Sequence, residues 1–592
     1  MANLVIAEQL FNSRLWLGSS LYPSPTVMLE AFAGARPGVV TLSLRRQTAG
    51  ELQNNSYWQT LKIWAVNNNV QLLPNTAGCH SAKEAILLAH MARELFSTSW
   101  IKLEVIGDEQ TLQPHPFELV RAAEQLVNDG FNCKNNHFNY APTVTGAGHA
   151  SVYTGTTPSV HGIIGNDWYD KYADESVYCA GDPNYNSVGT SSDAGKMSPH
   201  RIQTTTITDQ VRLHTQMKGK VIAVAIKDRG AVLPGGHTAN AAYWFDGGAE
   251  GNWITSSFYM DELPTWVTDF NTQKSVAKYK KPWSTLKDIN SYIESGVDDN
   301  NYEGLFEGQA TPTFPHDLVG LWDKNGKYSI LKSTPYGNSL TADFALEAVE
   351  KESLGTDSFT DFLAISFSST DYVGHKWGVN SKEVEDTYLR LDQDLKRLFD
   401  TLDKKVGTGE YTVFLTADHA AINVPAFLRD QKLPGGVVES KKMDDRLTEY
   451  LKYTYGTTDI VKKTSNNQLF LDYSVIKSLD LDIDDVEEEL ALELIQYDGI
   501  YKVFTANQMW QNQYTRGIPY IVQNGFNQKR SGDVLFVFDP GSGKYGDTGS
   551  THGSPWNYDT HAPLLFYGKG IKKGSTVNRT EIPDIAPTIA AL

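Results

Sequence analysis

The sequence is short of cysteine, of long apolar runs and of positive charge, and each shortage excludes a class of protein. Three cysteines, Cys79, Cys133 and Cys179, are too few for a disulfide framework. No apolar run approaches the roughly 20 residues of a membrane-spanning helix, so no membrane partner is expected. The formal net charge of -18 argues against nucleic acid as a partner, because that binding needs Lys and Arg to neutralise phosphates.

A secretory signal and an interdomain linker are also missing. The chain starts without a basic segment followed by an apolar one, which predicts a cytoplasmic protein. No stretch rich in Gly, Ser or Pro marks a boundary between domains. With 592 residues, 40% of them hydrophobic and 21% charged, the composition is that of a soluble globular protein, and it indicates no oligomeric state.

Residues 1–131 alternate short apolar strands with helical stretches, an order typical of parallel βα units. The pattern stops after four units, which is half of an eight-unit TIM-type barrel. We therefore predict a partial, barrel-like βα segment at the amino end. Its expected strands are Leu15–Gly18, Val39–Leu44, Val70–Leu73 and Trp100–Ile106, and its expected helices include Ala82–Leu95 and Phe117–Asn128.

From about residue 132 the composition changes to dense aromatic, Asn, Gly and Thr residues, with strands that end in polar clusters. Strand–helix–strand order predicts a second α/β domain, 132–592, with an open parallel sheet flanked by helices. Its clearest helix is Ser381–Leu402, because apolar residues recur there every three or four positions and predict one buried face. The expected strands are Lys220–Ile226, Asp361–Phe367, Tyr411–Thr416 and Pro563–Tyr567, and the expected buried face comprises Val384, Tyr388, Leu391, Leu395, Leu398 and Leu402.

Candidate metal ligands occur in three groups in this second domain. Asp371 and His375 are four residues apart, Asp418 and His419 are adjacent, and His552 stands alone. Asp oxygens and neutral His nitrogens bind zinc, and a catalytic zinc site leaves one position open for substrate. Each group alone is more typical of ordinary surface polarity. Together, after strands of one sheet, they indicate a metal centre.

Thr145 is the candidate nucleophile. It precedes a run of Gly, Ala and Gly, which permits close approach of the backbone, and Ala150–Thr154 can begin a helix. A helix N-terminus favours an anion, and a hydroxyl there can attack phosphorus when a metal lowers its pKa. The alternative is a Thr that simply caps the helix.

Several runs of residues 132–592 resemble the alkaline phosphatase superfamily, nearest to its zinc phosphomonoesterases with a threonine nucleophile and to its nucleotide pyrophosphatase/phosphodiesterase branch. The resemblance covers almost the whole segment and implies an alkaline-phosphatase-like fold. The runs that carry it are Pro142–His149, Tyr153–Pro158, His161–Asn166, Lys227–Arg229, Ser369–His375, Thr416–His419 and Thr551–Ser554.

The resemblance also implies a role for each site residue. It makes Thr145 the residue that becomes phosphorylated, and it implies two zinc ions and phosphate monoesters as small-molecule substrates. The Lys227/Arg229 pair favours monoesters over the alternative, a phosphodiesterase, because a monoester presents more negative charge. The resemblance assigns one zinc to Asp371, His375 and His552, with His561 as an alternative third ligand. It assigns the other zinc to Asp418, His419 and Thr145. It also implies that Asn166, Lys227 and Arg229 hold the phosphoryl oxygens.

Residues 1–131 resemble the amino-terminal half of thiazole synthase, the barrel enzyme of thiamin biosynthesis, in the runs Leu72–Gly78, Ala89–Arg93 and Trp100–Asp108. The resemblance implies that Lys102 forms an imine with a sugar phosphate and that Glu104 is its acid–base partner. Two residues apart on a strand, they point to the same side. The later barrel strands are missing, so we do not expect thiazole synthesis.

The phosphatase-like part lacks the family's first strand, which ends in an Asp that binds the second zinc. One hypothesis is that Trp100–Ile106 occupies its place in the sheet and offers Asp108 as a substitute ligand. Three interpretations of the chain follow: a phosphatase weakened by the foreign amino end, a thiazole synthase fragment, or an inactive chimera.

Overall fold

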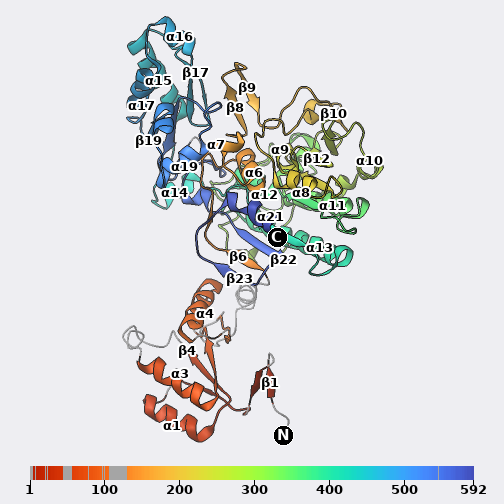
Figure 1. The fold of residues 1–592 in the computed structure, drawn as a ribbon, viewed down its shortest axis with the longest axis vertical. Coiled ribbons are helices and arrows are strands. Elements are labelled where there is room, and N and C mark those ends of the chain that lie inside the picture. Colours follow the sequence, from red (N-terminus) through yellow and green to blue (C-terminus); the bar gives the residue numbers. More distant parts are fainter. Residues whose placement is uncertain are drawn as a thin grey trace. The chain divides into compact units, whose positions relative to one another are not determined.

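The chain separates into two compact units, Met1–Asp129 and Gly130–Leu592, each with apolar clusters of its own (Figure 1). The structure, a computed structural model, describes residues 4–6, 9–11, 13–19, 22, 24–43, 56–77, 79–96, 98, 100–105, 130–543 and 546–592. Among these residues, no helix has the length and apolar character needed to cross a membrane.

The first unit contains a short parallel sheet in the order β3-β4-β5, as the βα pattern predicts. Its buried cluster is built around Phe32 of the first helix and Val40 of the central strand. The expected helix Phe117–Asn128 lies outside the described residues. The elements are β1 (Leu4–Ile6), β2 (Gln9–Phe11), β3 (Trp16–Gly18), α1 (Pro25–Ala35), β4 (Val39–Ser43), α3 (Ser56–Asn68), β5 (Gln71–Asn75) and α4 (Ala82–Phe96).

Residues 100–105 lie beside β5 in this first unit. Lys102 forms a parallel bridge with Asn75, and the Thr76 hydroxyl accepts from the Glu104 amide at 2.7 Å and donates to its carbonyl at 2.6 Å. The hypothesis that this strand enters the phosphatase-like sheet is therefore wrong, because its backbone already pairs within its own unit. Asp108 lies outside the described residues. Lys102 and Glu104 point to the same side and form an ion pair of 2.5 Å.

The second unit contains a five-stranded sheet in the order β10-β13-β12-β11-β14. Strands β12, β11 and β14 are parallel, whereas β13 runs antiparallel to both of its neighbours, β12 and β10, so the expectation of a parallel sheet is corrected at this one strand. The reversal arises because a short turn joins β12 directly to β13. The strands are β10 (Ser187–Val188), β11 (Val221–Ala225), β12 (Ala241–Asp246), β13 (Asn252–Ser256) and β14 (Phe362–Ser366).

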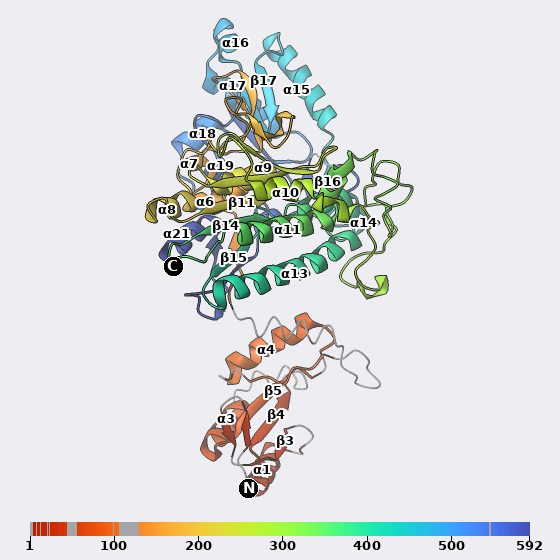
Figure 2. The same ribbon diagram turned by 90° about the vertical axis from the view of Figure 1, so that its right-hand side faces the viewer.

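Helices cover both faces of this sheet (Figure 2). On one face, α6, α8 and α9 share an apolar cluster with Ala223 and Ala364; on the other, α11 and α12 share one with Ile222 and Val224. This layering places the loops after the strands at a common edge. The helices are α6 (Thr145–Thr154), α8 (Ile207–His214), α9 (Asp228–Gly235), α11 (Pro335–Lys351), α12 (Ser369–Trp377) and α13 (Lys382–Leu402).

A separate four-stranded sheet has the order β15-β22-β6-β23. Strand β22 is antiparallel to β15 and β6. Its residues Leu564 and Phe566 join the same cluster as Ala364 of β14, so both sheets contribute to the apolar core on the α6 side. The strands are β6 (Phe131–Cys133), β15 (Thr412–Thr416), β22 (Leu564–Gly568) and β23 (Gly574–Thr576).

Helix α13 lies at its expected position, but its buried face differs from the prediction. Its fully buried side chains are polar, among them Asp386, which accepts from Trp283 at 2.7 Å, and Asp394, which accepts from Ser339 at 2.7 Å. Tyr388, in the predicted apolar face, is 57% exposed. The helix packs through a polar network, and its apolar stripe stays partly open.

A smaller lobe of the second unit holds the antiparallel sheet β17-β18-β20-β19, packed against α15, α16 and α17 (Figure 1). Its strands are β17 (Val461–Ser465), β18 (Gln468–Leu471), β19 (Ile500–Thr505) and β20 (Val534–Phe538). Its helices are α15 (Ser440–Tyr455), α16 (Tyr473–Ser478) and α17 (Ile483–Leu494). The remaining elements are β7 (Asn136–His137), α7 (Pro158–His161), β8 (Asp167–Asp170), β9 (Glu175–Tyr178), α10 (Thr265–Thr272), α14 (Pro425–Asp430), β16 (Gly436–Val437), α18 (Ala506–Gln511), α19 (Gly517–Gly525), β21 (Ser542–Gly543), α20 (Asn557–Thr560), β24 (Thr580–Glu581) and α21 (Ile585–Ala591).

Candidate metal centre and nucleophile

Thr145 is the first residue of α6 and is 1% exposed. The preceding residue, Val144, is extended, so the chain enters the helix at Thr145 with its hydroxyl in the first turn. Gly148 lies so close to Asp418 that a Cβ at this position would overlap the Asp418 carbonyl oxygen. The small residues after Thr145 therefore let the start of α6 pack directly against the loop after β15.

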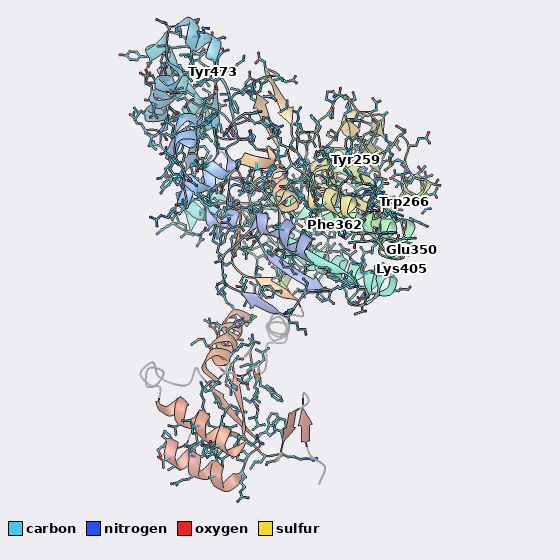
Figure 3. The ribbon with its side chains drawn as sticks, viewed as in Figure 1. Tyr259, Trp266, Glu350, Phe362, Lys405 and Tyr473 are labelled. Atoms are coloured by element: carbon cyan, nitrogen blue, oxygen red, sulfur yellow. The ribbon has the colours of Figure 1, made fainter. Side chains whose placement is uncertain are left out.

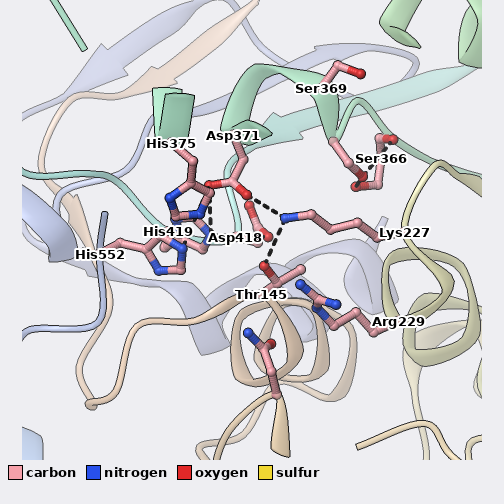
Figure 4. Close-up of polar contacts among 12 residues, drawn as sticks. Thr145, Lys227, Arg229, Ser366, Ser369, Asp371, His375, Asp418, His419 and His552 are labelled. Atoms are coloured by element: carbon pink, nitrogen blue, oxygen red, sulfur yellow. Dashed lines mark hydrogen bonds and ion pairs between the residues drawn. The ribbon is translucent and has the colours of Figure 1, made fainter. Parts of the chain in front are cut away.

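Asp371 and His375 lie on α12, one turn apart and on the same face of the helix. His375 Nε2 is 3.2 Å from Asp371 Oδ1, and His552 Nε2 is 3.7 Å from the same oxygen (Figure 4). Among the described residues, these three form the one group of three His, Cys, Asp or Glu side chains whose ligand atoms converge, all within 4.8 Å.

Asp418 and His419 follow β15 and lie beside this group. His419 Nε2 is 3.6 Å from Asp418 Oδ2 and 3.8 Å from Asp371 Oδ1. The His419 ring stacks on His552 with centroids 3.4 Å apart. The loop after β15 thus contributes two candidate metal ligands, Asp418 and His419, beside the group of three formed by Asp371, His375 and His552.

The hydrogen bonds of the histidines leave their ligand atoms available. Nδ1 of His375 donates to the Ser550 carbonyl at 2.8 Å, Nδ1 of His552 to Thr143 at 2.7 Å, and Nδ1 of His419 to Ala420 at 3.0 Å. A carbonyl only accepts, so each Nδ1 carries the proton and each Nε2 presents a lone pair. His419 Nε2 is buried without a hydrogen-bond partner among the described residues, which is the environment that a metal ion would satisfy. The residues present therefore fit a metal.

Electrostatics favour a charged Asp371 and a neutral His552. Burial disfavours the charged form of Asp371, but the contact with the Lys227 ammonium and the neighbouring imidazoles hold its pKa well below its usual range. Burial, then the nearby His419, lowers the pKa of His552 to about 3. A carboxylate and a neutral imidazole are the forms that bind metal.

Lys227 and Arg229 lie on the side of Thr145 away from the histidines (Figure 4), and Asn166 is tied to the same helix start. Lys227 Nζ is 3.4 Å from Thr145 Oγ1. Asn166 accepts from the Gly146 amide at 2.8 Å through Oδ1. The guanidinium of Arg229 donates to the Tyr178 hydroxyl at 3.0 Å, while its Nε is buried without a partner among the described residues. The arrangement is a cationic cradle for an anion.

The structure brings together every site residue predicted from the sequence except His561. Nε2 of His561 hydrogen-bonds to the Lys134 carbonyl at 3.1 Å and its ring stacks on His137 with centroids 4.8 Å apart, so it lies outside the group of Asp371, His375 and His552. The sequence analysis missed His149, whose Nδ1 donates to the Thr145 carbonyl at 2.9 Å. The signal was present, since the two residues are four apart at the start of a helix.

Tyr178 was also missed, and nothing in its sequence context identifies it. Its hydroxyl donates to Asp228 at 2.5 Å and accepts from Arg229. Burial opposes the charge on Arg229, but Tyr178 and Asp228 raise the pKa of the guanidinium. The strand β9 that carries Tyr178 thereby fixes the position of the arginine.

The fold and this site define a metallohydrolase-like α/β protein, and the comparisons give its family. The sequence model of type I phosphodiesterase / nucleotide pyrophosphatase matches residues 110–562. The chain belongs to this family. The prediction of an alkaline-phosphatase-like fold is confirmed.

Among its relatives, a protein of Myroides odoratus named calcium-transporting ATPase is 45% identical and covers 79% of this chain and 86% of its own. Alkaline phosphatase PhoV of Synechococcus elongatus is 44% identical, over 79% of this chain and 84% of its own. The crystal structure of alkaline phosphatase PafA matches with a TM-score of 0.76 at 42% identity, covering 79% of this chain and 90% of that one.

The amino-terminal resemblance is confirmed as well. The sequence model of thiazole biosynthesis protein ThiG matches residues 5–156. Thiazole synthase of Paracidovorax citrulli is 53% identical over 130 residues, which are 22% of this chain and 47% of that protein. The chain therefore spans about half the length of that thiazole synthase.

Proposed function

We propose that the second unit, Gly130–Leu592, hydrolyses phosphate monoesters through a covalent phosphothreonine at Thr145, supported by two zinc ions. The observation that carries the proposal is the convergence of three Nε2 lone pairs and two carboxylates beside a buried threonine hydroxyl that also faces Lys227. Homology to alkaline phosphatases supports the same reaction class.

Asp371, His375 and His552 would hold one zinc, and Asp418, His419 and the Thr145 oxygen the other. When bound, such ions supply Lewis acidity: they lower the pKa of a coordinated hydroxyl or water and neutralise charge on the attacking and leaving oxygens. The Nδ1 hydrogen bonds of the histidines hold the rings in position for this.

The chain's own residues account for the remaining steps. Arg229, Asn166 and Lys227 bind the non-bridging phosphoryl oxygens and place phosphorus next to Thr145 Oγ. Thr145 Oγ bonds to phosphorus as the ester P–O bond breaks, and the alcohol leaves with the bonding electrons and a proton. Water then attacks phosphorus, the Thr145–phosphorus bond breaks, and phosphate is released with Thr145 restored.

Lys227 and Arg229 favour a monoester over a diester. A monoester carries two negative charges on its free oxygens, whereas a diester carries one. The second cation stabilises the second negative charge. The name of the matching family keeps phosphodiester hydrolysis as the second candidate function. The discriminating measurement is the ratio of kcat/KM for p-nitrophenyl phosphate to that for bis-p-nitrophenyl phosphate.

The direct test of the intermediate is acid quenching during turnover of p-nitrophenyl phosphate, followed by mass spectrometry of the peptide that contains Thr145. We expect phosphate on Thr145, and on the serine of a Thr145→Ser variant as the matched control. Turnover with phosphate on neither, or undiminished turnover by Thr145→Ala, would refute the mechanism.

A further inference from the structure

Asp559 is a fully buried residue of the short helix α20, and it contacts two of the loops beside the metal centre. Side chains fill the interior of the second unit (Figure 3), and the exposed fraction of Asp559 is 0%. Its Oδ2 accepts from the Ser554 amide at 2.7 Å, whereas its Oδ1 is buried without a hydrogen-bond partner among the described residues. A buried carboxyl group with one unsatisfied oxygen lowers the stability of the folded state, so packing alone does not explain its presence.

The side-chain contact of Asp559 leads to His552. Ser554, two residues after His552, donates its amide to Asp559, and its carbonyl accepts from the Thr143 hydroxyl at 3.1 Å. The Thr143 carbonyl in turn accepts from Nδ1 of His552 at 2.7 Å. The orientation of the His552 ring therefore depends on a closed path of hydrogen bonds that Asp559 anchors.

The same path reaches the segment before the nucleophile. Thr143 lies two residues before Thr145 and is fully buried. Its hydroxyl and its carbonyl both bond to the loop 551–554, through Ser554 and His552. The chain that enters α6 and the loop that carries His552 are thus fixed to each other.

The backbone of Asp559 contacts the other half of the metal centre. Its carbonyl accepts from the Ala420 amide at 3.0 Å, and the Ala420 carbonyl accepts from Nδ1 of His419 at 3.0 Å. A substitution of the Asp559 side chain removes the contact with Ser554 and leaves this backbone bond in place. The effect of such a substitution should therefore be larger at His552 than at His419.

The loop that carries His552 contains a glycine in a conformation that other residues rarely adopt. Gly553, directly after His552, has a φ of 118°. Glycine loses more backbone freedom on folding than any other residue, so hydrogen bonds from outside the loop are needed to hold it in one conformation. The bonds of Ser554 to Asp559 and Thr143 have this role.

We propose that Asp559 is a positioning residue for the metal centre. Its carboxyl group fixes the loop 551–554, so that His552 Nε2 faces Asp371, 3.7 Å away, before a metal binds. Residues that orient a metal ligand in this way raise the affinity for the metal, because less binding energy is spent on ordering the ligand. The identity of the metal as zinc rests on the proposed function; the ordering of the loop does not.

Hydrogen exchange of the full chain without metal tests the ordering of the loop. Asp559→Ala should speed amide exchange in the peptide that spans residues 551–554 by about tenfold or more. Burial raises the pKa of Asp559 to about 7, so a neutral side chain of the same shape suits this position. Asp559→Asn keeps an oxygen for the Ser554 amide and should stay within about threefold of the unaltered chain. Unchanged exchange in Asp559→Ala, or equally faster exchange throughout 130–592, would overturn the proposal.

Zinc titration tests the consequence for metal binding. Asp559→Ala should weaken the tighter zinc, assigned to Asp371, His375 and His552, by about tenfold or more, and Asp559→Asn should restore most of that affinity. The weaker class of zinc binding should change by less than about threefold, because the bond to Ala420 remains. Equal affinity of Asp559→Ala and the unaltered chain, or equal losses in both classes, would contradict the positioning role.

A double-mutant cycle tests the path through Ser554. Thr143→Val removes the hydroxyl that bonds to the Ser554 carbonyl but keeps the Thr143 carbonyl for His552. Each single variant should weaken the tighter zinc, and Asp559→Ala with Thr143→Val should weaken it by less than the product of the two separate effects. Independent, multiplicative losses would show that the two residues do not act on the same loop.

Asp533 provides the matched control for the loss of a buried carboxyl group. It precedes β20 in the small lobe, is 1% exposed, and accepts from the Leu471 amide at 2.8 Å and from the Tyr473 hydroxyl at 2.5 Å (Figure 3 labels Tyr473). Asp533→Ala should leave zinc affinity unchanged within about threefold. An equal loss of zinc affinity in Asp533→Ala and Asp559→Ala would mean general destabilisation, and it would overturn the proposal.

The two measurements keep this proposal separate from the proposed function. Zinc binding that depends on Asp559, in a chain without phosphatase activity, would uphold the positioning role and refute the proposed function. Phosphatase activity and zinc affinity that are both unaffected by Asp559→Ala would do the reverse.

Discussion

The two halves of the metal centre differ in where their ligands come from. Asp371, His375 and His552 are held by a helix turn and a loop, whereas Asp418 and His419 follow β15, the end strand of the described four-stranded sheet. The first half has three converging His and Asp ligands, whereas the second has two, with the Thr145 oxygen as its third proposed ligand. The comparison leads us to expect that the half with three His and Asp ligands binds zinc more tightly than the half with two.

The largest expected effect removes the nucleophile that both halves share. Thr145→Ala should lower kcat/KM for p-nitrophenyl phosphate by about a thousandfold or more, because no other hydroxyl takes its place. Bound zinc at the three-ligand half should stay the same. Thr154→Ala, at the other end of α6, is the matched control and should retain activity. A loss of zinc in Thr145→Ala would mean that the two halves are not separable.

Removing one histidine from each half tests the comparison itself. His552→Ala should abolish tight zinc binding, because it leaves two protein ligands in the stronger half. His419→Ala should leave the tight zinc in place and affect only the weaker one. Isothermal titration with zinc distinguishes the two variants. Equal losses of zinc affinity in the two variants would contradict the expectation that the group of Asp371, His375 and His552 binds zinc more tightly.

Lys227 lies between the halves, in contact with Asp371 and 3.4 Å from Thr145 Oγ1. Lys227→Ala should reduce kcat/KM for the monoester by about a hundredfold and for the diester by less than about tenfold, because the second substrate charge loses its partner. Lys220→Ala, before the same β11 strand but on the surface, is the control. Equal losses on both substrates would undercut the monoester assignment.

The smallest expected effect lies in the small lobe, away from both halves. Burial raises the pKa of Glu487 to about 7 from an ordinary value of 4.5. Its folded state therefore binds the proton more tightly than its unfolded state, so stability should fall as pH rises from about 4.5 to 7 and level off above that. Glu487→Gln should reduce the Tm difference between pH 5 and pH 8 by about 2–4 °C. An unchanged difference would show that Glu487 does not titrate in this range.

The sequence predicted most of the site because its signals are local. Asp371 and His375 are one helical turn apart, Asp418 and His419 are adjacent, and each group follows an apolar strand. Thr145 was recognisable from the small residues that follow it. One of them, Gly148, is required because its backbone packs against Asp418.

What the sequence did not reveal depends on contacts between distant segments. The burial of Asp386 in α13 requires Trp283 and Tyr292, about a hundred residues earlier in the chain, and periodicity carries no information about such partners. The position of Tyr178 beside Arg229 likewise arises only when β9 meets α9. The hypothesis that residues 100–106 enter the second sheet was wrong because their pairing beside β5 rests on contacts that the sequence does not show, the backbone bridge at Lys102 and the Thr76 hydroxyl.

The most direct test of the account is the number of zinc ions retained per chain, measured by elemental mass spectrometry after dialysis against a weak chelator. The account predicts about one tightly held ion, at Asp371, His375 and His552, and a second class of binding at least about tenfold weaker. Two ions of equal affinity would show that the Asp418–His419 half is complete in this chain, and no retained ion would show that the three-ligand group is not a zinc site.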